Sequence, residues 1–161
     1  MAKDSQCAIA LGSNLGDSLT TLEGTINQLS QTAGITVQAC SSWYQTAPVG
    51  PPQPDFINGC ALLEVELTPQ ELLRDLFGVE NQFERVRQQR WGARTLDLDL
   101  LLFDDLILET SDLQIPHPRM NKRAFVLVPL AEIAPNWIEP KSKEAIARLV
   151  QAVDCSGIRR L

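Results

Sequence analysis

The chain has 161 residues, a length that fits one domain with its own hydrophobic core, so we expect a single domain over residues 1–161. Its formal net charge of −6 disfavours a general nucleic-acid binder, because such proteins carry a basic stripe for the phosphate backbone. No segment approaches the roughly 20 apolar residues of a membrane span, and the first residues lack signal-peptide character, so we expect a cytoplasmic protein that binds neither nucleic acid nor membrane.

The first third of the chain predicts a strand, a helix and a second strand. Residues 7–11 are a short apolar run that leads into a turn-rich segment. Asp17 or Ser18 then caps a helix whose apolar residues recur at spacings of three and four, at Leu19, Leu22, Ile26 and Leu29. A second strand over residues 35–43 is predicted by the alternation of Ile35, Val37, Ala39 and Trp43.

The middle of the chain predicts a strand, a second helix and a fourth strand. Apolar residues alternate over residues 56–67, after a proline-rich loop. Thr68 and Glu71 have the spacing of a capping box with Pro69 at the first helical position, and the buried face of this helix should comprise Leu72, Leu76, Val79, Phe83 and Val86. Residues 96–103 predict the fourth strand.

This βαββαβ order is that of the ferredoxin-like fold, an α+β arrangement with a mostly antiparallel sheet. A C-terminal helical annex should follow, with a loop that holds His117, a helical piece over residues 125–133 and a last helix over residues 142–153. The cysteines are widely spaced and form no Cys-x-x-Cys pair, so we expect buried free thiols at Cys7, Cys40, Cys60 and Cys155.

The fourth strand carries two carboxylates where a buried strand would have apolar residues. Side chains two residues apart share a face, about 6.6 Å from one another, so Asp97 and Asp99 point one way while Leu98 points the other. A divalent cation would account for them, and Mg²⁺ is usually held by one or two carboxylates with water and phosphates. The alternative is a solvent-facing strand with both acids paired to arginines, but the apolar run over residues 100–103 favours a strand buried on both faces.

Several arginines precede this strand, at positions 85, 87, 90 and 94. Their number suits an anion as large as a nucleoside triphosphate. A solvated helix end is the alternative, because cations are favoured near a helix C-terminus, but a Trp-Gly insert at residues 91–92 is harder to explain in that way.

Short motifs in a fixed order make the chain similar to a known family over residues 7 to about 135. They are Gly12-Ser13-Asn14-Leu15-Gly16, Tyr44-x-Thr46-x-Pro48-x-Gly50-Pro51, Pro54-x-Phe56-x-Asn58, Arg85-x-Arg87, Arg90-Trp91-Gly92-x-Arg94-Thr95-Leu96-Asp97-Leu98-Asp99, Pro116-His117-Pro118-Arg119-Met120 and Arg123-Ala124-Phe125. The ordered set resembles the 6-hydroxymethyl-7,8-dihydropterin pyrophosphokinases of folate biosynthesis. Any one motif is weak, but the string that ends in Asp97-Leu98-Asp99 is specific.

The resemblance implies a ferredoxin-like enzyme that transfers the terminal diphosphate of ATP to the hydroxymethyl group of 6-hydroxymethyl-7,8-dihydropterin and releases AMP. It implies that Asp97 and Asp99 hold two Mg²⁺ ions that bridge the phosphates. It also implies that Arg85 and Arg94 bind the moving diphosphate, since a guanidinium fork matches phosphate oxygens.

The resemblance further assigns residues to the two substrates. The ATP site would include Arg87, Trp91, His117 and Arg123. The pterin site would include backbone groups of Thr46 and Val49, the Asn58 amide, and the rings of Phe56 and Phe125 on either side of the flat substrate. Without the resemblance, the two phenylalanines would be core residues and His117 an ordinary loop histidine. Glu80 matches an acidic position of the family, with a plain surface carboxylate as the alternative.

Two other functions fit part of this pattern. A nucleotidyltransferase with Gly-Ser and Asp-x-Asp motifs also uses two metals, but its acids follow shortly after the Gly-Ser, whereas a long stretch of chain separates Ser13 from Asp97 here. A non-catalytic ferredoxin-like module would have no need of paired acids beside arginines.

We expect the protein to be a monomer.

Overall fold

The computed structural model describes residues 4–47, 54–84 and 96–161. Its central sheet has the order β10-β3-β4-β1-β5, with β2 also paired to β4, and every paired neighbour is antiparallel. The elements up to the last central strand are β1 (Ser5–Ser13), α1 (Ser18–Ser30), β2 (Ile35–Cys40), β3 (Tyr44–Thr46), β4 (Phe56–Val65), α2 (Pro69–Glu84) and β5 (Asp97–Phe103). The predicted α+β class is confirmed, and the predicted second strand is divided into β2 and β3.

The annex after β5 contains more strands than the sequence predicted. Its elements are β6 (Leu108–Glu109), β7 (Gln114–Ile115), a 3-10 turn (Met120–Lys122), α3 (Ala124–Ile133), β8 (Ile138–Glu139), β9 (Glu144–Ala145), α4 (Ile146–Gln151) and β10 (Ile158–Arg160). The helix predicted over residues 142–153 was wrong in its limits, because residues 142–145 form part of the turn and the second strand of a β8–β9 hairpin, and α4 ends at Gln151. Strand β10 returns to the central sheet and pairs with β3.

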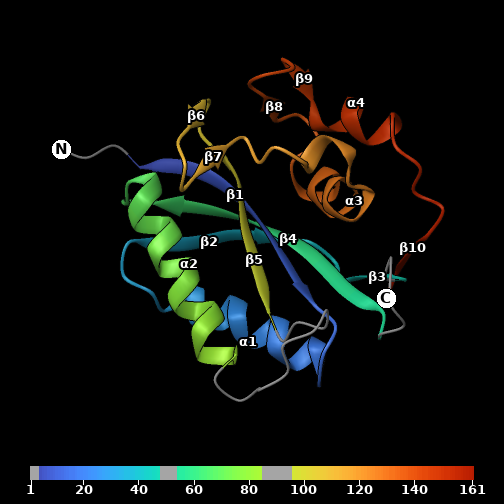
Figure 1. Ribbon diagram of the computed structural model, residues 1–161, viewed down its shortest axis with the longest axis horizontal. Coiled ribbons are helices and arrows are strands. Elements are labelled where there is room, and N and C mark those ends of the chain that lie inside the picture. The colour runs from blue at the N-terminus through green and yellow to red at the C-terminus, as the bar shows by residue number, and fades with distance from the viewer. Residues whose placement is uncertain (1–3, 48–53, 85–95) are drawn as a thin grey trace.

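Two hydrophobic cores lie on opposite faces of the sheet (Figure 1). Helices α1 and α2 cover one face, and their buried residues include Leu22, Leu29, Leu72, Leu76 and Val79. Helices α3 and α4 cover the other face. Leu19, which shares the apolar spacing of this helix, is 40% exposed in the first turn of α1. Val86 lies outside the described residues.

Local capping sets the start of both long helices, as predicted. The Asp17 carboxylate accepts a hydrogen bond from Thr20 N at 3.2 Å. At α2, Thr68 N donates to Glu71 Oε1 at 2.9 Å and Glu71 N donates to Thr68 Oγ1 at 3.2 Å, which completes the capping box. These bonds satisfy amide groups that the first helical turn leaves without a partner.

Strand β1 has large side chains on one face and small ones on the other. Ile9 and Leu11 pack toward α1 and α2, whereas Ala8 and Ala10 face α3. Residue Gly12 continues the row of small residues, so the sheet has a shallow floor on the α3 side where β1 approaches its end. This floor lies beneath the site described below.

The cysteines are free in the structure, as expected. Cys7 and Cys60 are buried, and burial raises the pKa of the Cys7 thiol to about 12. Cys40 is exposed, against expectation, because alternate residues of β2 face solvent. No helix within the described residues is long and apolar enough to cross a membrane.

Gly78 lies on the exposed side of α2, and a Cβ atom there would have no heavy atom within 4 Å. We therefore expect Gly78→Ala to raise the free energy of unfolding by about 1 kcal/mol, because glycine loses more conformational freedom in a helix than alanine does. Urea unfolding measures this change. Gly59→Ala is the contrasting variant, since its Cβ would lie 2.4 Å from the Trp43 ring, and it should be destabilised. Equal stability of Gly78→Ala and the parent chain would contradict the expectation.

Candidate active site

The two acids of β5 lie where the sequence placed them. Asp97 is directly opposite Gly12 of β1, and Asp99 is directly opposite Ala10. Leu98 and Leu100, between and after them, are buried in the core beneath α2. Both carboxylates therefore face the α3 side of the sheet, above its floor of small residues. The run over residues 100–103 is fully buried, which confirms that β5 is covered on both faces beyond its first turn.

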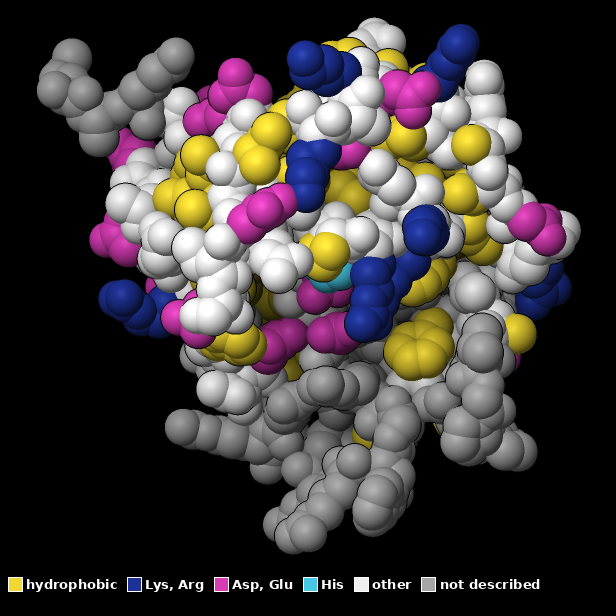
Figure 2. Space-filling view, turned by 45° about the horizontal axis from the view of Figure 1, so that its top comes forward, with side chains coloured by type: hydrophobic (Ala, Val, Ile, Leu, Met, Phe, Trp, Pro, Cys, Tyr) yellow, Lys and Arg dark blue, Asp and Glu magenta, His cyan; other side chains and the backbone are white. Residues whose placement is uncertain are grey.

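Two cavities meet at this carboxylate pair. The larger has a volume of about 690 Å³ and the smaller about 350 Å³, and both are lined by Asp97, Asp99 and Arg123. Figure 2 shows the histidine of the chain in a hollow of this face, with acidic side chains below it and basic side chains beside it. The acids are thus accessible from two sides.

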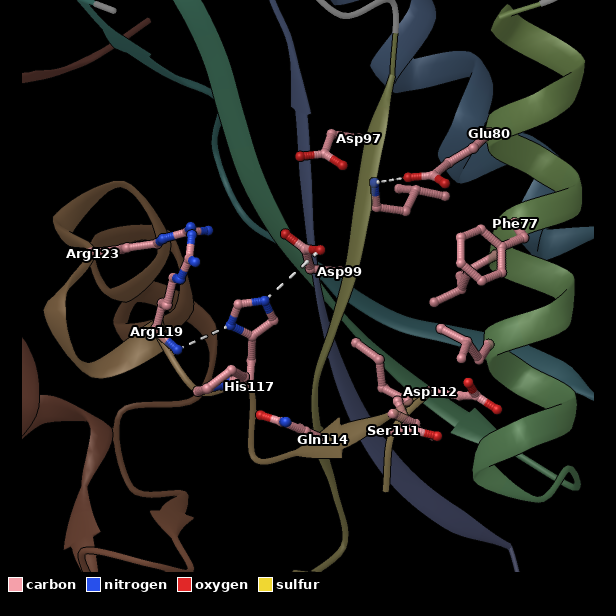
Figure 3. A pocket seen from close by; sticks show the side chains of 16 residues that line it. Phe77, Glu80, Asp97, Asp99, Ser111, Asp112, Gln114, His117, Arg119 and Arg123 are labelled. Carbon is pink, nitrogen blue, oxygen red and sulfur yellow. Dashed lines mark hydrogen bonds and ion pairs between the residues drawn. The ribbon is translucent and has the colours of Figure 1, made fainter. Parts of the chain in front are cut away.

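The larger cavity has polar and cationic walls (Figure 3). His117, Arg119 and Arg123 line one side of it. Helix α2 contributes Phe77 and Glu80 from the opposite side. The segment over residues 111–114 closes the far end. A long anionic ligand with an aromatic end would find cations near the acids and an aromatic ring further away.

His117 is oriented by two contacts. Its Nδ1 accepts a hydrogen bond from Arg119 N at 3.2 Å, and its Nε2 faces Asp99 Oδ1 at 3.9 Å. Burial lowers the pKa of His117, and the nearby Arg123 and Arg119 act in the same direction, against the opposite effect of Asp99. A neutral imidazole whose Nδ1 accepts must carry its proton on Nε2, so His117 presents an N–H donor toward the acids.

The smaller cavity is narrower and less polar. Thr46 and Phe56, which are directly opposite each other on β3 and β4, line one wall together with Asn58. Phe125 at the start of α3 lines the other wall, and the Arg123 guanidinium lies 5.4 Å from the centre of its ring. The predicted pterin residues in the described part of the chain therefore meet around one cavity.

Gly12 allows the Asn58 amide to reach this floor. A Cβ atom at Gly12 would lie only 2.8 Å from Asn58 Nδ2, which is closer than real contacts permit. Any larger residue at position 12 would displace the amide. The absence of a side chain at Gly12, the glycine of the Gly-Ser motif, therefore leaves room for the Asn58 amide.

Comparison with known proteins agrees with this geometry. The family model described as 7,8-dihydro-6-hydroxymethylpterin-pyrophosphokinase matches residues 8–135. The chain belongs to this family. It is 52% identical over 150 residues to the 2-amino-4-hydroxy-6-hydroxymethyldihydropteridine pyrophosphokinase of Synechocystis sp., covering 93% of this chain and 77% of that one. The protein of the same name from Haemophilus influenzae is 44% identical over 144 residues, 89% of each chain.

The fold of this pyrophosphokinase family member also occurs in a solved structure of low sequence identity. The wild-type HPPK-DHPS of Plasmodium falciparum with pteroate matches 92% of this chain with a TM-score of 0.73 and 13% identity. This chain spans 42% of that longer chain, so the likeness concerns the shared fold.

Glu80 has a specific role in this pyrophosphokinase fold rather than that of a plain surface carboxylate. Its Oε2 accepts a hydrogen bond from Leu98 N at 2.7 Å. Strand β5 lies at the edge of the sheet, so this N–H has no neighbouring strand to donate to. Figure 3 shows Glu80 reaching from α2 to the backbone between the two acids. The bond holds β5 at the point from which Asp97 and Asp99 project.

Some predicted site residues of the pyrophosphokinase lie outside the described part of the chain. They are Val49, Arg85, Arg87, Trp91 and Arg94. Sequence reasoning gave no role to Phe77 or Arg119, which the structure places on the larger cavity. Phe77 is 55% exposed and lies outside the buried face of α2. An aromatic residue outside the predicted apolar face of this helix was the sequence signal that could have identified it. Arg119 lay within a recognised motif but had no assigned partner.

Proposed function

We propose that the larger cavity binds ATP, that the smaller cavity binds the pterin, and that the reacting groups meet at Asp97 and Asp99. The chain is a pyrophosphokinase of folate biosynthesis, which transfers a diphosphate to 6-hydroxymethyl-7,8-dihydropterin with ATP as co-substrate. The observation that carries the placement is that two cavities of different character share one carboxylate pair.

The carboxylate pair fits Mg²⁺. Asp97 and Asp99 offer hard oxygen ligands from one face of a strand, and the Asp99 side chain is 33% exposed, which leaves room for water and phosphate oxygens. Among residues 4–47, 54–84 and 96–161, no group of three or more His, Cys, Asp or Glu side chains could hold a metal ion. The remaining ligands would therefore come from ATP and water. Two Mg²⁺ ions held here would offset charge on the attacking and leaving oxygens.

The N–H donors of the larger cavity bind the phosphates. His117 presents its Nε2–H, and Arg123 presents its guanidinium, at the side where both cavities open onto the acids. Arg85 and Arg94 are proposed to bind the moving diphosphate, and Arg87 and Trp91 to contact ATP. In the transfer, the hydroxymethyl oxygen bonds to the β-phosphorus while the bond from this phosphorus to the oxygen of the α-phosphate breaks. AMP leaves, and the hydroxyl proton passes to solvent.

The smaller cavity suits a flat heteroaromatic ring. Phe56 and Phe125 provide apolar faces on opposite walls, and the Asn58 amide provides both a donor and an acceptor at the edge. Thr46 and Val49 are proposed to contact the ring through backbone groups. A ring bound on the floor over Gly12 and Ala10 would point its substituent toward the acids.

The adenine is proposed to lie against Phe77. This ring is 55% exposed on the larger cavity, at the wall opposite the cations. We expect Phe77→Ala to raise KM for ATP about tenfold with little change in KM for the pterin, because base–aromatic stacking contributes roughly 1 to 3 kcal/mol. Steady-state kinetics with each substrate varied in turn measures both values. Ile138→Ala, an exposed apolar residue of the annex, is the control. An unchanged KM for ATP would reject this position for the base.

One assay tests the proposed function against its alternatives. The chain is incubated with ATP, Mg²⁺ and 6-hydroxymethyl-7,8-dihydropterin, and the products are separated. We expect AMP and pterin diphosphate in equal amounts. Pyrophosphate with a nucleotidylated product would indicate a nucleotidyltransferase, and the absence of any product would indicate a binding module.

The assembly and location of the enzyme also belong to this proposal. We propose that it is a monomer. A cytoplasmic location suits an enzyme that consumes ATP. Sedimentation analysis at the protein concentrations used in the assay would reveal a dimer if the proposal of a monomer were wrong.

A further inference from the structure

Glu132, near the end of α3, is bound to the segment that enters β3. Tyr44 Oη donates a hydrogen bond to Glu132 Oε1 at 2.5 Å. Ser42 N lies 3.1 and 3.0 Å from the two carboxylate oxygens, and Ser42 Oγ donates to Oε2 at 3.1 Å. Bonds to an ionised carboxylate are the stronger class of protein hydrogen bond. None of these three residues belongs to the site described above.

The protonation states suit this arrangement. Burial and the bond to Glu132 raise the pKa of Tyr44 to about 12. Burial alone would raise the pKa of Glu132, but hydrogen bonds from Tyr44 and Ser42 outweigh it, so that this pKa lies below its ordinary value. Near neutral pH, a neutral phenol therefore donates to a charged carboxylate, and Tyr44 is only 8% exposed.

The sheet register connects Tyr44 to the site. Tyr44 is directly opposite Asn58, Asn58 is directly opposite Gly12, and Gly12 is directly opposite Asp97. Directly opposite residues of antiparallel strands have side chains on the same face. A single row across β3, β4, β1 and β5 thus leads from Tyr44 to the acids. Thr46, two residues after Tyr44, faces the same side and lines the smaller cavity.

Helix α3 connects Glu132 to the opposite wall of the same cavity. Phe125 precedes Glu132 by seven residues, which is about two helical turns, so both side chains lie on nearly the same side of the helix. The rest of the α3 contact with the sheet is largely apolar, with Val126, Leu127 and Leu130 buried. Apolar packing is not directional, whereas hydrogen bonds fix the position of one element against another.

We propose that the bonds of Tyr44 and Ser42 to Glu132, here called the α3–β3 clamp, set the separation between the Thr46 wall and the Phe125 wall of the smaller cavity. The clamp residues are positioning residues for the flat substrate and do not contact it. This inference rests on the proposed placement of the pterin in that cavity. A ring held on both faces needs its walls placed to within about 0.5 Å, so loss of the clamp should affect pterin binding first.

Tyr44→Phe tests the clamp because it removes one hydroxyl and keeps the ring. We expect about a tenfold increase in the dissociation constant for the pterin, measured by titration with Mg²⁺ and a non-hydrolysable ATP analogue present. KM for ATP, and kcat at saturating pterin, should change by less than about twofold. Glu132→Leu should have a larger effect in the same direction. In the Glu132→Leu variant, Tyr44→Phe should cause little further increase in the dissociation constant for the pterin, because both substitutions remove the same hydrogen bond.

Ile26→Ala in α1 is the matched control, since it lowers stability from the other side of the sheet and leaves α3 untouched. If the clamp only stabilised the fold, Tyr44→Phe would resemble Ile26→Ala, with a lower melting temperature and unchanged pterin affinity, and the inference would be overturned. Failure of the proposed function is distinguishable, because the parent chain would then bind no pterin at all. An increase in the pterin dissociation constant confined to the clamp variants supports the inference.

Discussion

Replacement of Asp97 or Asp99 by Asn should lower kcat by about three orders of magnitude or more, because the variant loses a charge that holds Mg²⁺ against the phosphates. The fold should survive, since the two side chains face cavities rather than the packed core beneath α2. Steady-state kinetics over a range of Mg²⁺ concentrations measures the loss, and circular dichroism checks the fold.

Asp105→Asn is a suitable control for this experiment. Asp105 is an exposed carboxylate just beyond the end of β5, outside both cavities. It should retain the activity of the parent chain. If both Asp97→Asn and Asp99→Asn turned over at near-normal rates, the metal assignment would have to be abandoned.

Phe125→Ala should weaken pterin binding by about 10-fold to 100-fold while the affinity for ATP changes little. The substitution removes one of the two aromatic faces proposed for the ring, and stacking adds about 0.5 to 1.5 kcal/mol beyond the burial of apolar area. Calorimetric titration with each ligand separately measures both affinities.

Phe77→Ala serves as the reciprocal control for Phe125→Ala. The two phenylalanines line different cavities, so each variant should affect one substrate and spare the other. Unchanged pterin binding in Phe125→Ala would reject the aromatic sandwich. Loss of pterin affinity in Phe77→Ala instead would reverse the assignment of the cavities.

The sequence by itself determined the features that depend on near neighbours in the chain. The alternation along β5 placed Asp97 and Asp99 on one face, because successive side chains of a strand point to opposite sides. The capping box of Thr68 and Glu71 set the start of α2 through bonds between residues three apart. The βαββαβ order followed from such local patterns.

Only the tertiary structure decided which distant side chains meet. The bond from Leu98 to Glu80 joins residues 18 apart, and the bond from Tyr44 to Glu132 joins residues 88 apart. The limits of α4 were missed because helical periodicity does not reveal a competing β8–β9 pairing. Periodicity reports which face of an element is buried, whereas the partner on that face depends on how the elements pack. For that reason the acids could be found in the sequence, but the two cavities that share them could not.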